Sequence, residues 1–400
     1  MYKRIKYFLT SDPASGILLL LAAITALTIA NSPLQASYQS LLNFYLFGIS
    51  VSHWINDGLM ALFFLMIGLE VKRELIEGSL NSRSKAMLPA IAALGGMLFP
   101  IIIFLFFNYK DPIAINGWAA PAATDIAFAL AILSLLGKRV PVELKVFLLA
   151  LAIIDDLGVI FIIAIFYNSE PSGMMLLFVL TISLFLFFCG KKQFSSLALY
   201  FVLFIVLWFT VYHSGIHATL AGVIAGFLIP QTCRAGKSPA KRVEHLLNPY
   251  VAFCILPLFA FANSGVTFSS IQAISDYSHL PLGIALGLFV GKPIGVFLFS
   301  WLAIKLGIAQ LPQQVNMRMI LAVAVLCGIG FTMSIFISTL AFPAEQSVMV
   351  DYTKIGILMG SSASALLGFS MLSRALPSVV AQEVPASSLT NTKLQQSRLE

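Results

Sequence analysis

Two adjacent aspartates, Asp155 and Asp156, stand in an almost wholly apolar run, ALAIIDDLGVIFII, at residues 150–163. Carboxylate oxygens can hold a proton or a hard cation, and a carboxylate is costly to bury without such a partner. Three other apolar segments carry equally unusual groups near their centres. These groups are Thr124 and Asp125 in PAATDIAFAL, Lys292 in FVGKPIGVF, and Gly328 with Gly330 in LCGIGFTMS.

The composition of the chain indicates whether these groups lie in a soluble protein or in a membrane protein. The chain of 400 residues is 59% hydrophobic and 10% charged, with a mean hydropathy of +0.94. Such values are typical of polytopic membrane proteins and exclude an ordinary soluble domain. A net charge of +7 can indicate nucleic-acid binding, but no polar segment is long enough for a basic soluble domain. The four cysteines lie far apart without CxxC spacing, so neither a zinc site nor a disulfide framework is indicated.

Twelve apolar segments are candidates to span a membrane, and several of the last six are short or interrupted by Gly and Pro. Pro, Gly or charged residues separate them, and an even number of spans places both termini on one side. The segments lie near residues 11–30, 54–71, 87–107, 113–136, 142–167, 173–190, 196–211, 214–230, 247–263, 281–303, 319–342 and 349–373.

The basic residues test this count, because Lys and Arg collect in cytoplasmic loops. With twelve spans, every Lys and Arg except three falls on the side that holds the N-terminus. Lys110 and Lys354 lie on the opposite side, and Lys292 lies inside a span. The pattern predicts a multi-pass membrane protein with both termini in the cytoplasm.

The sequence also makes predictions for three segments outside the spans. Residues 41–53, LLNFYLFGISVSH, alternate and contain a glycine suited to a turn, which predicts a short extracytoplasmic β-hairpin after the first span. The polar tail 376–400 lacks periodicity and is predicted to be a disordered cytoplasmic extension. Residues 1–10 are predicted to form a short cytoplasmic N-terminus.

Charges at the middle of a membrane need a reason, since one charged side chain there costs at least about 2.5 kcal/mol. An internal ion pair that only holds helices together would account for Lys292 and one aspartate. It leaves two acids that must face water, a cation or a proton. Adjacent helical residues project about 100° apart, so we expect one of Asp155 and Asp156 to face Lys292. The other should face an ion cavity with Asp125, where Thr124 can add an oxygen.

Two spans are interrupted at their centres. Pro121 precedes the acid in 113–136, and Gly328 with Gly330 divides 319–342. These spans, the fourth and the eleventh, are the middle members of two three-span units. The units are offset by seven spans, an odd number, so they have opposite orientations. Inverted units with broken helices at the midplane are typical of secondary transporters.

Several longer motifs point to a family. The chain resembles NhaA-type Na⁺/H⁺ antiporters from about residue 7 to residue 375, and motifs of this length are highly specific. The motifs are WINDGLMALFFLMIGLEVKREL, PAATDIAFAL, LAIIDDLGVI, HATLAGVIAGF, SPAKRVEH, LPLFAFANSGV, GKPIG and LCGIGFTMSIF.

The resemblance implies an all-α fold of twelve transmembrane helices, with two inverted three-helix repeats and crossed broken helices at spans 4 and 11. The core repeats would be residues 86–170 and 281–375, and the interface region would be residues 11–85 and 171–265. The resemblance also implies a homodimer linked by the hairpin after span 1.

Roles for single residues follow from the same resemblance. Asp155 and Asp156 would carry Na⁺, Li⁺ or protons, and Lys292 would pair with Asp155. Asp125 and Thr124 would lie at the crossed broken helices as further cation ligands. Exchange would be electrogenic, with two protons against one Na⁺, and no cofactor would be needed.

The family also associates certain positions with a response to pH. Charged residues at helix ends are about as often plain solvated caps, so both readings stay open for these positions. The matching residues are Glu70, Glu74, His217, Glu244 and His245.

Two other functions also place aspartates in a membrane. An intramembrane aspartyl protease needs a GxGD motif, but GIGF has Phe331 at the Asp position. A cation channel would explain acids along a pore, but it explains neither Lys292 nor the inverted units. No Walker A motif is present, so the proton gradient is the expected energy source. We therefore expect a transporter that serves pH homeostasis and salt tolerance, and not an enzyme.

Overall fold

The computed structural model describes residues 12–167, 172–233, 236, 238–267, 279–343 and 346–376. The predicted cytoplasmic N-terminus and the predicted tail beyond residue 376 lie outside these residues. The described part is helical except for one small hairpin and the connecting turns. The prediction of a mostly helical membrane protein is therefore confirmed.

Long helices form most of the molecule. Single helices are α2 (Asp12–Ala30), α6 (Arg83–Asn108), α8 (Val142–Phe166), α9 (Gly173–Lys191), α10 (Leu197–Tyr212), α11 (Leu220–Leu228) and α19 (Ser347–Ala375). Three runs contain a π-helical turn: α4 (Val51–His53), η1 (Trp54–Leu59) and α5 (Met60–Ile76); α12 (Pro239–Tyr250), η5 (Val251–Ile255) and α13 (Leu256–Asn263); α15 (His279–Leu286), η7 (Gly287–Gly291) and α16 (Lys292–Lys305). Short helical pieces are α3 (Gln35–Leu42), η2 (Ser79–Asn81) and η4 (Gly137–Arg139).

Two helix pairs are bent at a short break. The 3₁₀ helix η3 (Ala114–Ala122) meets α7 (Ile126–Leu135) at 40°, and α17 (Met317–Cys327) meets α18 (Phe331–Ala341) at 42°. Both predicted interruptions are therefore confirmed. Seven helices in the described residues are long and apolar enough to cross a membrane, or nine if each bent pair is one span. The twelve-span count stays a prediction.

One predicted span differs clearly from the structure. The range 214–230 is regular α-helix only in α11, Leu220–Leu228. Turns occupy the preceding residues, where Gly215 has a φ of 83°. This backbone conformation is unfavourable for residues with a Cβ atom and ends a helix, so the apolar composition predicted more helix than forms.

The predicted hairpin is present after α3. Strands β1 (Tyr45–Leu46) and β2 (Ile49–Ser50) are antiparallel, with Tyr45 opposite Ser50 and Leu46 opposite Ile49. The two turn residues, Phe47 and Gly48, have φ values of 54° and 81°. Positive φ at both positions is typical of the tight turns that match the twist of a hairpin.

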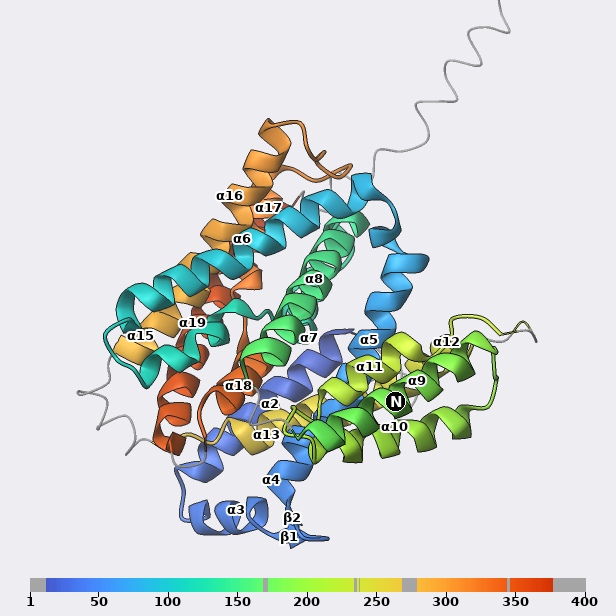
Figure 1. Cartoon of the computed structure of the whole chain (residues 1–400). Helices are drawn as coiled ribbons and strands as arrows, with labels where there is room; N and C mark the ends of the chain where they lie inside the picture. The colour runs from blue at the N-terminus through green and yellow to red at the C-terminus, as the bar shows by residue number, and fades with distance from the viewer. Residues whose placement is uncertain are drawn as a thin grey trace, which may run out of the picture.

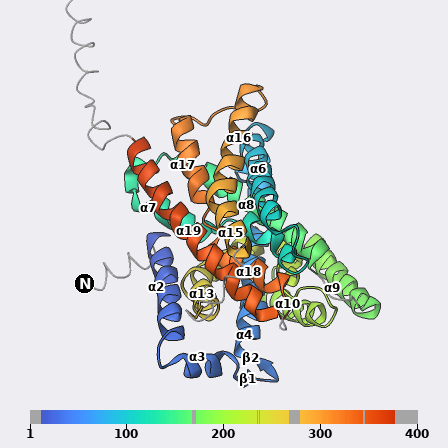
Figure 2. The same ribbon diagram turned by 90° about the vertical axis from the view of Figure 1, so that its left-hand side faces the viewer.

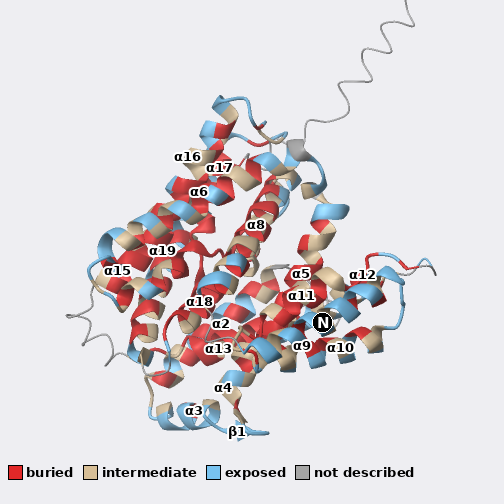
Figure 3. Cartoon of the chain, viewed as in Figure 1, coloured by how far each residue is buried: buried red, intermediate tan, exposed pale blue. Residues whose placement is uncertain are grey.

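The helices form two groups (Figure 1). Helices α6, α8 and α15 to α19 lie together, and α5 and α9 to α12 lie on the other side of the molecule. The view turned by 90° agrees, with α2 and α13 adjoining the first group (Figure 2). Buried residues line the inner faces of both groups, whereas α9 and α10 carry much exposed surface (Figure 3). Phe178, Phe185 and Phe201 are more than half exposed there, as expected of helices that face lipid.

Candidate cation and proton site

The breaks in the two bent pairs touch each other. The N–H of Asp125 donates to the carbonyl of Ile329 at 2.7 Å, and the hydroxyl of Thr124 donates to the carbonyl of Cys327 at 3.2 Å. These bonds satisfy backbone groups that the breaks leave unpaired, which is required where no water is available. The broken segments therefore form one joint structure in the middle of the protein.

Glycines let this joint structure pack closely. A Cβ atom on Gly328 would lie 2.4 Å from the carbonyl oxygen of Leu288, and one on Gly330 would lie 2.9 Å from the Leu288 side chain. Neither glycine has a positive φ. Their role here is close approach to η7, and Ser361 stabilises the start of α18 by accepting hydrogen bonds from the N–H groups of Gly330 and Phe331, each at 3.2 Å.

Asp125 caps both broken helices. Its Oδ1 accepts a hydrogen bond from the N–H of Phe128 at 3.0 Å, at the start of α7. Its Oδ2 accepts from the N–H and the hydroxyl of Thr332, at 3.0 and 2.5 Å, at the start of α18. A carboxylate placed at two helix N-termini is stabilised by the N–H groups and by the helix dipoles. Thr332 was missed from the sequence, although a hydroxyl residue directly after the glycine break is a signal that could have found it.

Asp155 forms the predicted pair with Lys292. The Lys292 Nζ lies 3.0 Å from Asp155 Oδ2, and both side chains are fully buried. Thr124 donates its hydroxyl to the same oxygen at 2.7 Å, and Lys292 also donates to the carbonyl of Ala122. A buried charge pair needs such extra hydrogen bonds to offset the loss of water.

The position of Thr124 corrects one expectation. Its side chain binds Asp155 and does not face the cavity next to Asp125. Ala123 and Asp125 have extended backbone angles, and successive side chains in an extended segment point in opposite directions. Thr124 and Asp125 therefore serve opposite sides of the break, which their adjacency in sequence could not reveal.

A tight helix crossing brings Lys292 to this position. On α6 and α16, a Cβ atom on Gly95 would lie 2.3 Å from the carbonyl oxygen of Gly295, and one on Gly295 would lie 2.0 Å from that of Gly95. Only residues without a side chain allow backbones to come so close, as is common in membrane proteins. The Lys292 side chain thus passes Gly96 and reaches Asp155.

Asp156 differs from its neighbour. It is 1% exposed, and neither of its carboxylate oxygens has a hydrogen-bond partner among the described residues. It lines a cavity of about 340 Å³ that Asp125 and Thr332 also line. This cavity, here named the Asp156 chamber, extends to Glu70, Arg73 and Glu244. The expected division is present, with Asp155 on the lysine and Asp156 in a cavity with Asp125.

An arginine gathers three carboxylates at the other end of the chamber. Arg73 lies 3.7 Å from Glu70 and 3.2 Å from Glu74, and it forms an ion pair with Glu244. Three of the residues matched to pH response are thus brought together. His245 is exposed on α12, and the ion pairs of this cluster do not include it.

His217 lies in a different cavity. A cavity of about 880 Å³, here named the His217 chamber, is also lined by Asn56, Asn263, Asp351 and Lys354. Asn56 stands near the start of the run in which Glu70 stands near the end, so the two chambers lie toward opposite ends of the helices. The structure therefore does not bring His217 to the carboxylate cluster.

The oxygens of the site do not close into a cage. Within the described ranges, no group of three or more His, Cys, Asp or Glu side chains is arranged to hold a metal ion. Asp125 accepts hydrogen bonds at both oxygens, and Asp155 binds Lys292 and Thr124 through Oδ2 while its Oδ1 has no partner among the described residues. Of these three carboxylates, Asp156 is the one with both oxygens free in the part of the chain that the structure describes. Carboxylate and hydroxyl oxygens of this kind are the donors that small hard cations prefer.

The chain is similar along most of its length to proteins of known function. Residues 6–372 match the family described as Na⁺/H⁺ antiporter 1. The Na⁺/H⁺ antiporter NhaA of Vibrio parahaemolyticus is 59% identical over 93% of this chain and 98% of its own length, and that of Vibrio cholerae is 58% identical over 94% and 99%.

A solved structure supports the fold. The sodium proton antiporter MjNhaP1 of Methanocaldococcus jannaschii superposes with a TM-score of 0.55 over 91% of this chain and 93% of that chain, at 16% identity. The chain therefore belongs to the Na⁺/H⁺ antiporter 1 family.

Proposed function

We propose that this antiporter moves Na⁺ or Li⁺ out of the cytoplasm and H⁺ into it, with Asp156 as the group that binds both in turn. The observation that carries the proposal is the buried carboxylate of Asp156, which has two unpaired oxygens in a chamber shared with Asp125. Family membership makes the chain a transporter of Na⁺ and H⁺ rather than an enzyme, and it needs no cofactor.

Competition for one carboxylate couples the two flows. In a low-dielectric interior, a bare carboxylate is unfavourable, so either a proton or a cation neutralises it. When Na⁺ arrives, the proton must leave, and the reverse happens on the other side of the membrane. Asp125 adds negative potential to the same chamber, and its bonds to both helix breaks connect cation binding to the position of these helices.

The Asp155 and Lys292 pair is our candidate for the second proton. Protonation of Asp155 would break the pair, and loss of a proton from Lys292 when Na⁺ arrives would deliver the same proton count. Either route gives two protons for one Na⁺ and an electrogenic exchange. The direct contact of the pair with Thr124 and Ala122 at the break supports this coupling.

Alternating access would require a barrier that moves. Three buried phenylalanines, Phe64, Phe259 and Phe336, each stand on their helix run between residues that line the two chambers. Their ring centroids are 5.3 Å (Phe64 to Phe336) and 6.2 Å (Phe259 to Phe336) apart. On α18, Met333 lines the Asp156 chamber, Thr339 lines the His217 chamber, and Phe336 stands between them. We propose that these rings close the extracytoplasmic side while the Asp156 chamber opens toward the cytoplasm.

The wider architecture is proposed from the sequence pattern. Twelve spans in the inner membrane would place both termini in the cytoplasm. Residues 86–170 and 281–375 would form the moving core of inverted repeats, and residues 11–85 and 171–265 would form the region that makes a homodimer through the β1–β2 hairpin. The grouping of α6 and α8 with α15 to α19 supports this division (Figure 1).

The Arg73 cluster is our candidate for pH regulation. Three carboxylates around one guanidinium leave an excess of negative charge when all are ionised, and protonation of any one reduces it. Glu70 and Glu244 line the chamber that leads to Asp156. A change of charge there would alter the cation concentration at the entrance, because narrow charged clefts focus the field.

Transport in everted membrane vesicles tests the proposal. After respiration has acidified the interior, addition of NaCl or LiCl should release the proton gradient, whereas KCl should not. Vesicles that lack the protein and vesicles with Asp156→Asn at equal expression are the controls. Equal responses of wild type and Asp156→Asn to NaCl would refute the assignment of Asp156.

A further inference from the structure

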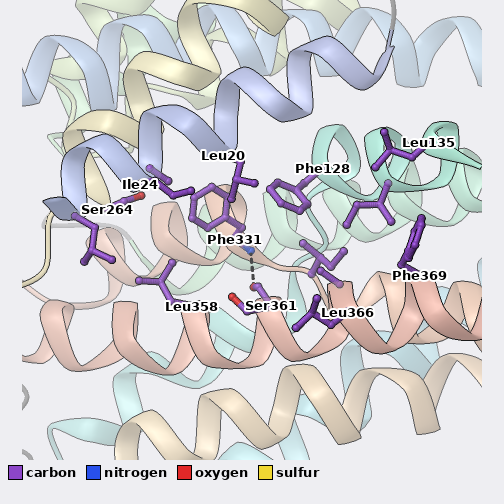
Figure 4. Close-up of a pocket in the computed structure, with 16 residues that line it drawn as sticks. Leu20, Ile24, Phe128, Leu135, Ser264, Phe331, Leu358, Ser361, Leu366 and Phe369 are labelled. Atoms are coloured by element: carbon purple, nitrogen blue, oxygen red, sulfur yellow. Dashed lines mark hydrogen bonds between the residues drawn. The ribbon is translucent and has the colours of Figure 1, made fainter.

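An apolar groove separates α2 from α19 on the outside of the helix breaks. Its volume is about 600 Å³, within the range of about 300–1,000 Å³ that ligand sites occupy. Leu20 and Ile24 of α2 form one wall, and Leu358, Ser361 and Leu366 of α19 form the opposite wall (Figure 4). The groove is separate from both chambers, because it shares no lining residue with the His217 chamber and reaches the acids of the Asp156 chamber only through the backbone.

The floor of the groove is made by the two breaks. Phe128 follows Asp125 on α7, and its N–H is the group that Asp125 caps at 3.0 Å. Phe331 begins α18, and its N–H donates to Ser361 at 3.2 Å, the dashed line in Figure 4. The two rings meet edge to face with centroids 5.9 Å apart. Whatever fills the groove therefore presses on the first turn of both half-helices.

The rim of the groove is continuous with the lipid-facing surface. Leu20 is 44% exposed, Ile24 is 50% exposed and Leu366 is 75% exposed. In a membrane-spanning bundle, exposed apolar side chains of this size face hydrocarbon. The stretch of α19 from Leu358 to Phe369 rises about 16 Å, about half the thickness of the hydrocarbon core. Such a length suits one acyl chain within one leaflet.

One end of the groove is basic. Leu135 and Phe369 line this end. Lys138 follows Leu135 in η4, Arg374 follows Phe369 on α19, and both basic residues are exposed. Arg139 fixes the η4 turn to the end of α19, since it donates to the carbonyls of Ser373 and Leu376 at 2.7 and 3.0 Å.

No carboxylate neutralises this basic end among the described residues. Their ion pairs include neither Lys138 nor Arg374. The basic end is on the side that the Lys and Arg pattern assigns to the cytoplasm, where anionic headgroups gather and attract exposed basic residues.

We propose that the groove binds an anionic phospholipid of the cytoplasmic leaflet, with one acyl chain between α2 and α19 and the phosphate at Lys138 and Arg374. The acyl chain packs on Phe128 and Phe331 and so stabilises the arrangement of the breaks seen here. Binding itself does not depend on the proposed exchange. The effect on transport does, because it acts through the helices that carry Asp125.

Photocrosslinking in liposomes tests the binding. The full-length protein is reconstituted with a trace of phosphatidylglycerol that carries a diazirine in its acyl chain, and the labelled peptides are identified. We expect labels on α2 and α19 at the groove, and weaker labelling by the matched phosphatidylcholine. Lys138→Gln with Arg374→Gln should lower the affinity for phosphatidylglycerol by about tenfold. The charge-matched control, Lys305→Gln with Arg318→Gln, alters two exposed basic residues elsewhere on the same predicted side and should leave it unchanged.

A second variant fills the groove. Ser362 lines it and is exposed, so Ser362→Trp should block acyl labelling without disturbing the core, whereas Leu367→Trp, exposed on α19 outside the lining, should not. Equal labelling by both lipids that neither variant changes would show ordinary annular lipid and overturn the proposal. Crosslinks to a second copy of the chain in place of lipid would also overturn it. Because these readouts measure binding alone, an inactive antiporter would still test the groove.

Discussion

The two chambers show how similar polar cavities can have different access to the same acids. The His217 chamber is the larger, about 880 Å³ against about 340 Å³, and it carries histidine, asparagine, aspartate and lysine side chains. Only the smaller chamber reaches Asp125 and Asp156. The size and polarity of a chamber therefore do not decide whether it reaches these acids.

We attribute this difference in access to the acids to apolar packing between the two chambers. Phe64, Phe259 and Phe336 are buried, come from three separate helix runs, and each stands on its run between residues that line the two chambers. The rings of Phe64 and Phe259 both contact that of Phe336. On the other side, the Asp156 chamber includes Phe63 and Met333 in its lining and is one cavity from Glu70 to Asp156. Small movements of packed helices switch such contacts in an all-or-none manner. From this comparison we expect the three phenylalanine rings to control access to the site, and the Asp156 carboxylate to bind the cation and the proton.

The largest effect should come from the acid that the smaller chamber exposes. Asp156→Asn keeps the shape of the side chain but can exchange neither a proton nor a charge for Na⁺, so Na⁺-dependent proton movement should disappear. The variant should fold, because neither oxygen has a hydrogen-bond partner to lose among the described residues. Exchange in vesicles and the melting temperature in detergent measure the two outcomes. A folded variant with normal exchange would contradict the role of this chamber.

The second effect concerns the acid that faces away from both chambers. Lys292→Ala would leave Asp155 as an unpaired buried charge and should lower the free energy of unfolding by about 3–5 kcal/mol. Asp155→Asn should be similarly destabilising, because it would leave Lys292 as a buried positive charge without its carboxylate. The double variant Lys292→Gln with Asp155→Asn removes both charges, so its stability should exceed that of either single variant.

Melting temperatures of the four proteins give the coupling. Purely additive losses would show that the 3.0 Å contact contributes no pair energy. Transport separates the roles further, because Asp155→Asn should lose exchange if Asp155 carries a proton and should keep it if Asp155 only holds the lysine.

The sequence predicted which groups form the site better than it predicted which cavity reaches them. The two interruptions follow from Pro121 and from Gly328 with Gly330, and the different directions of the two adjacent aspartates follow from helix geometry, which acts within a few residues. Which aspartate pairs with Lys292 was implied only by the resemblance to the NhaA family. The phenylalanine barrier could not be predicted, because its rings are distant in sequence and look like any other apolar residue of a span. Thr124 was misplaced for a similar reason, since the backbone angles of a break decide which way it points.

The barrier itself gives the third prediction. Phe336→Ala should open a path between the chambers, because a large ring is replaced by a methyl group. In a background with the four native cysteines replaced by serine, Met333→Cys reports access to the Asp156 chamber. A membrane-impermeant thiol reagent added from the side of the His217 chamber should label it much faster after Phe336→Ala. Phe104→Ala removes an equally buried ring elsewhere and controls for general loosening; equal rates in both variants would refute the barrier.

The fourth prediction compares the entrances of the two chambers. Glu70→Gln removes one carboxylate from the Arg73 cluster at the mouth of the smaller chamber, so it should shift the pH dependence of exchange while leaving maximal exchange measurable. Asp351→Asn makes the same change in the wall of the larger chamber, where Asp351 binds Lys354 at 3.2 Å. It should shift the profile less, since in this conformation that chamber does not reach Asp156. A larger shift from Asp351→Asn would reverse the assignment of the two entrances.

The smallest effect should come from Asp111, which lies outside both chambers and between two helices, η3 and α6, and contacts His279. Burial works to raise the pKa of the Asp111 carboxyl, but hydrogen bonds from the N–H groups of Ala114 and Ile113 and from His279 outweigh it, so its pKa lies below its ordinary value. A lowered pKa in the folded state means that the charged carboxylate stabilises the fold above its ordinary pKa, and that this stability is lost as the pH falls through the lowered value. Asp111→Asn should therefore lower stability by at most about 1 kcal/mol at pH 7, as for other exposed pairs, and the difference from wild type should shrink below about pH 4. Melting temperatures at pH 7 and at pH 3.5 measure this, and a difference that grows in acid would mean that the neutral carboxyl, rather than the charged one, is the form that the fold stabilises.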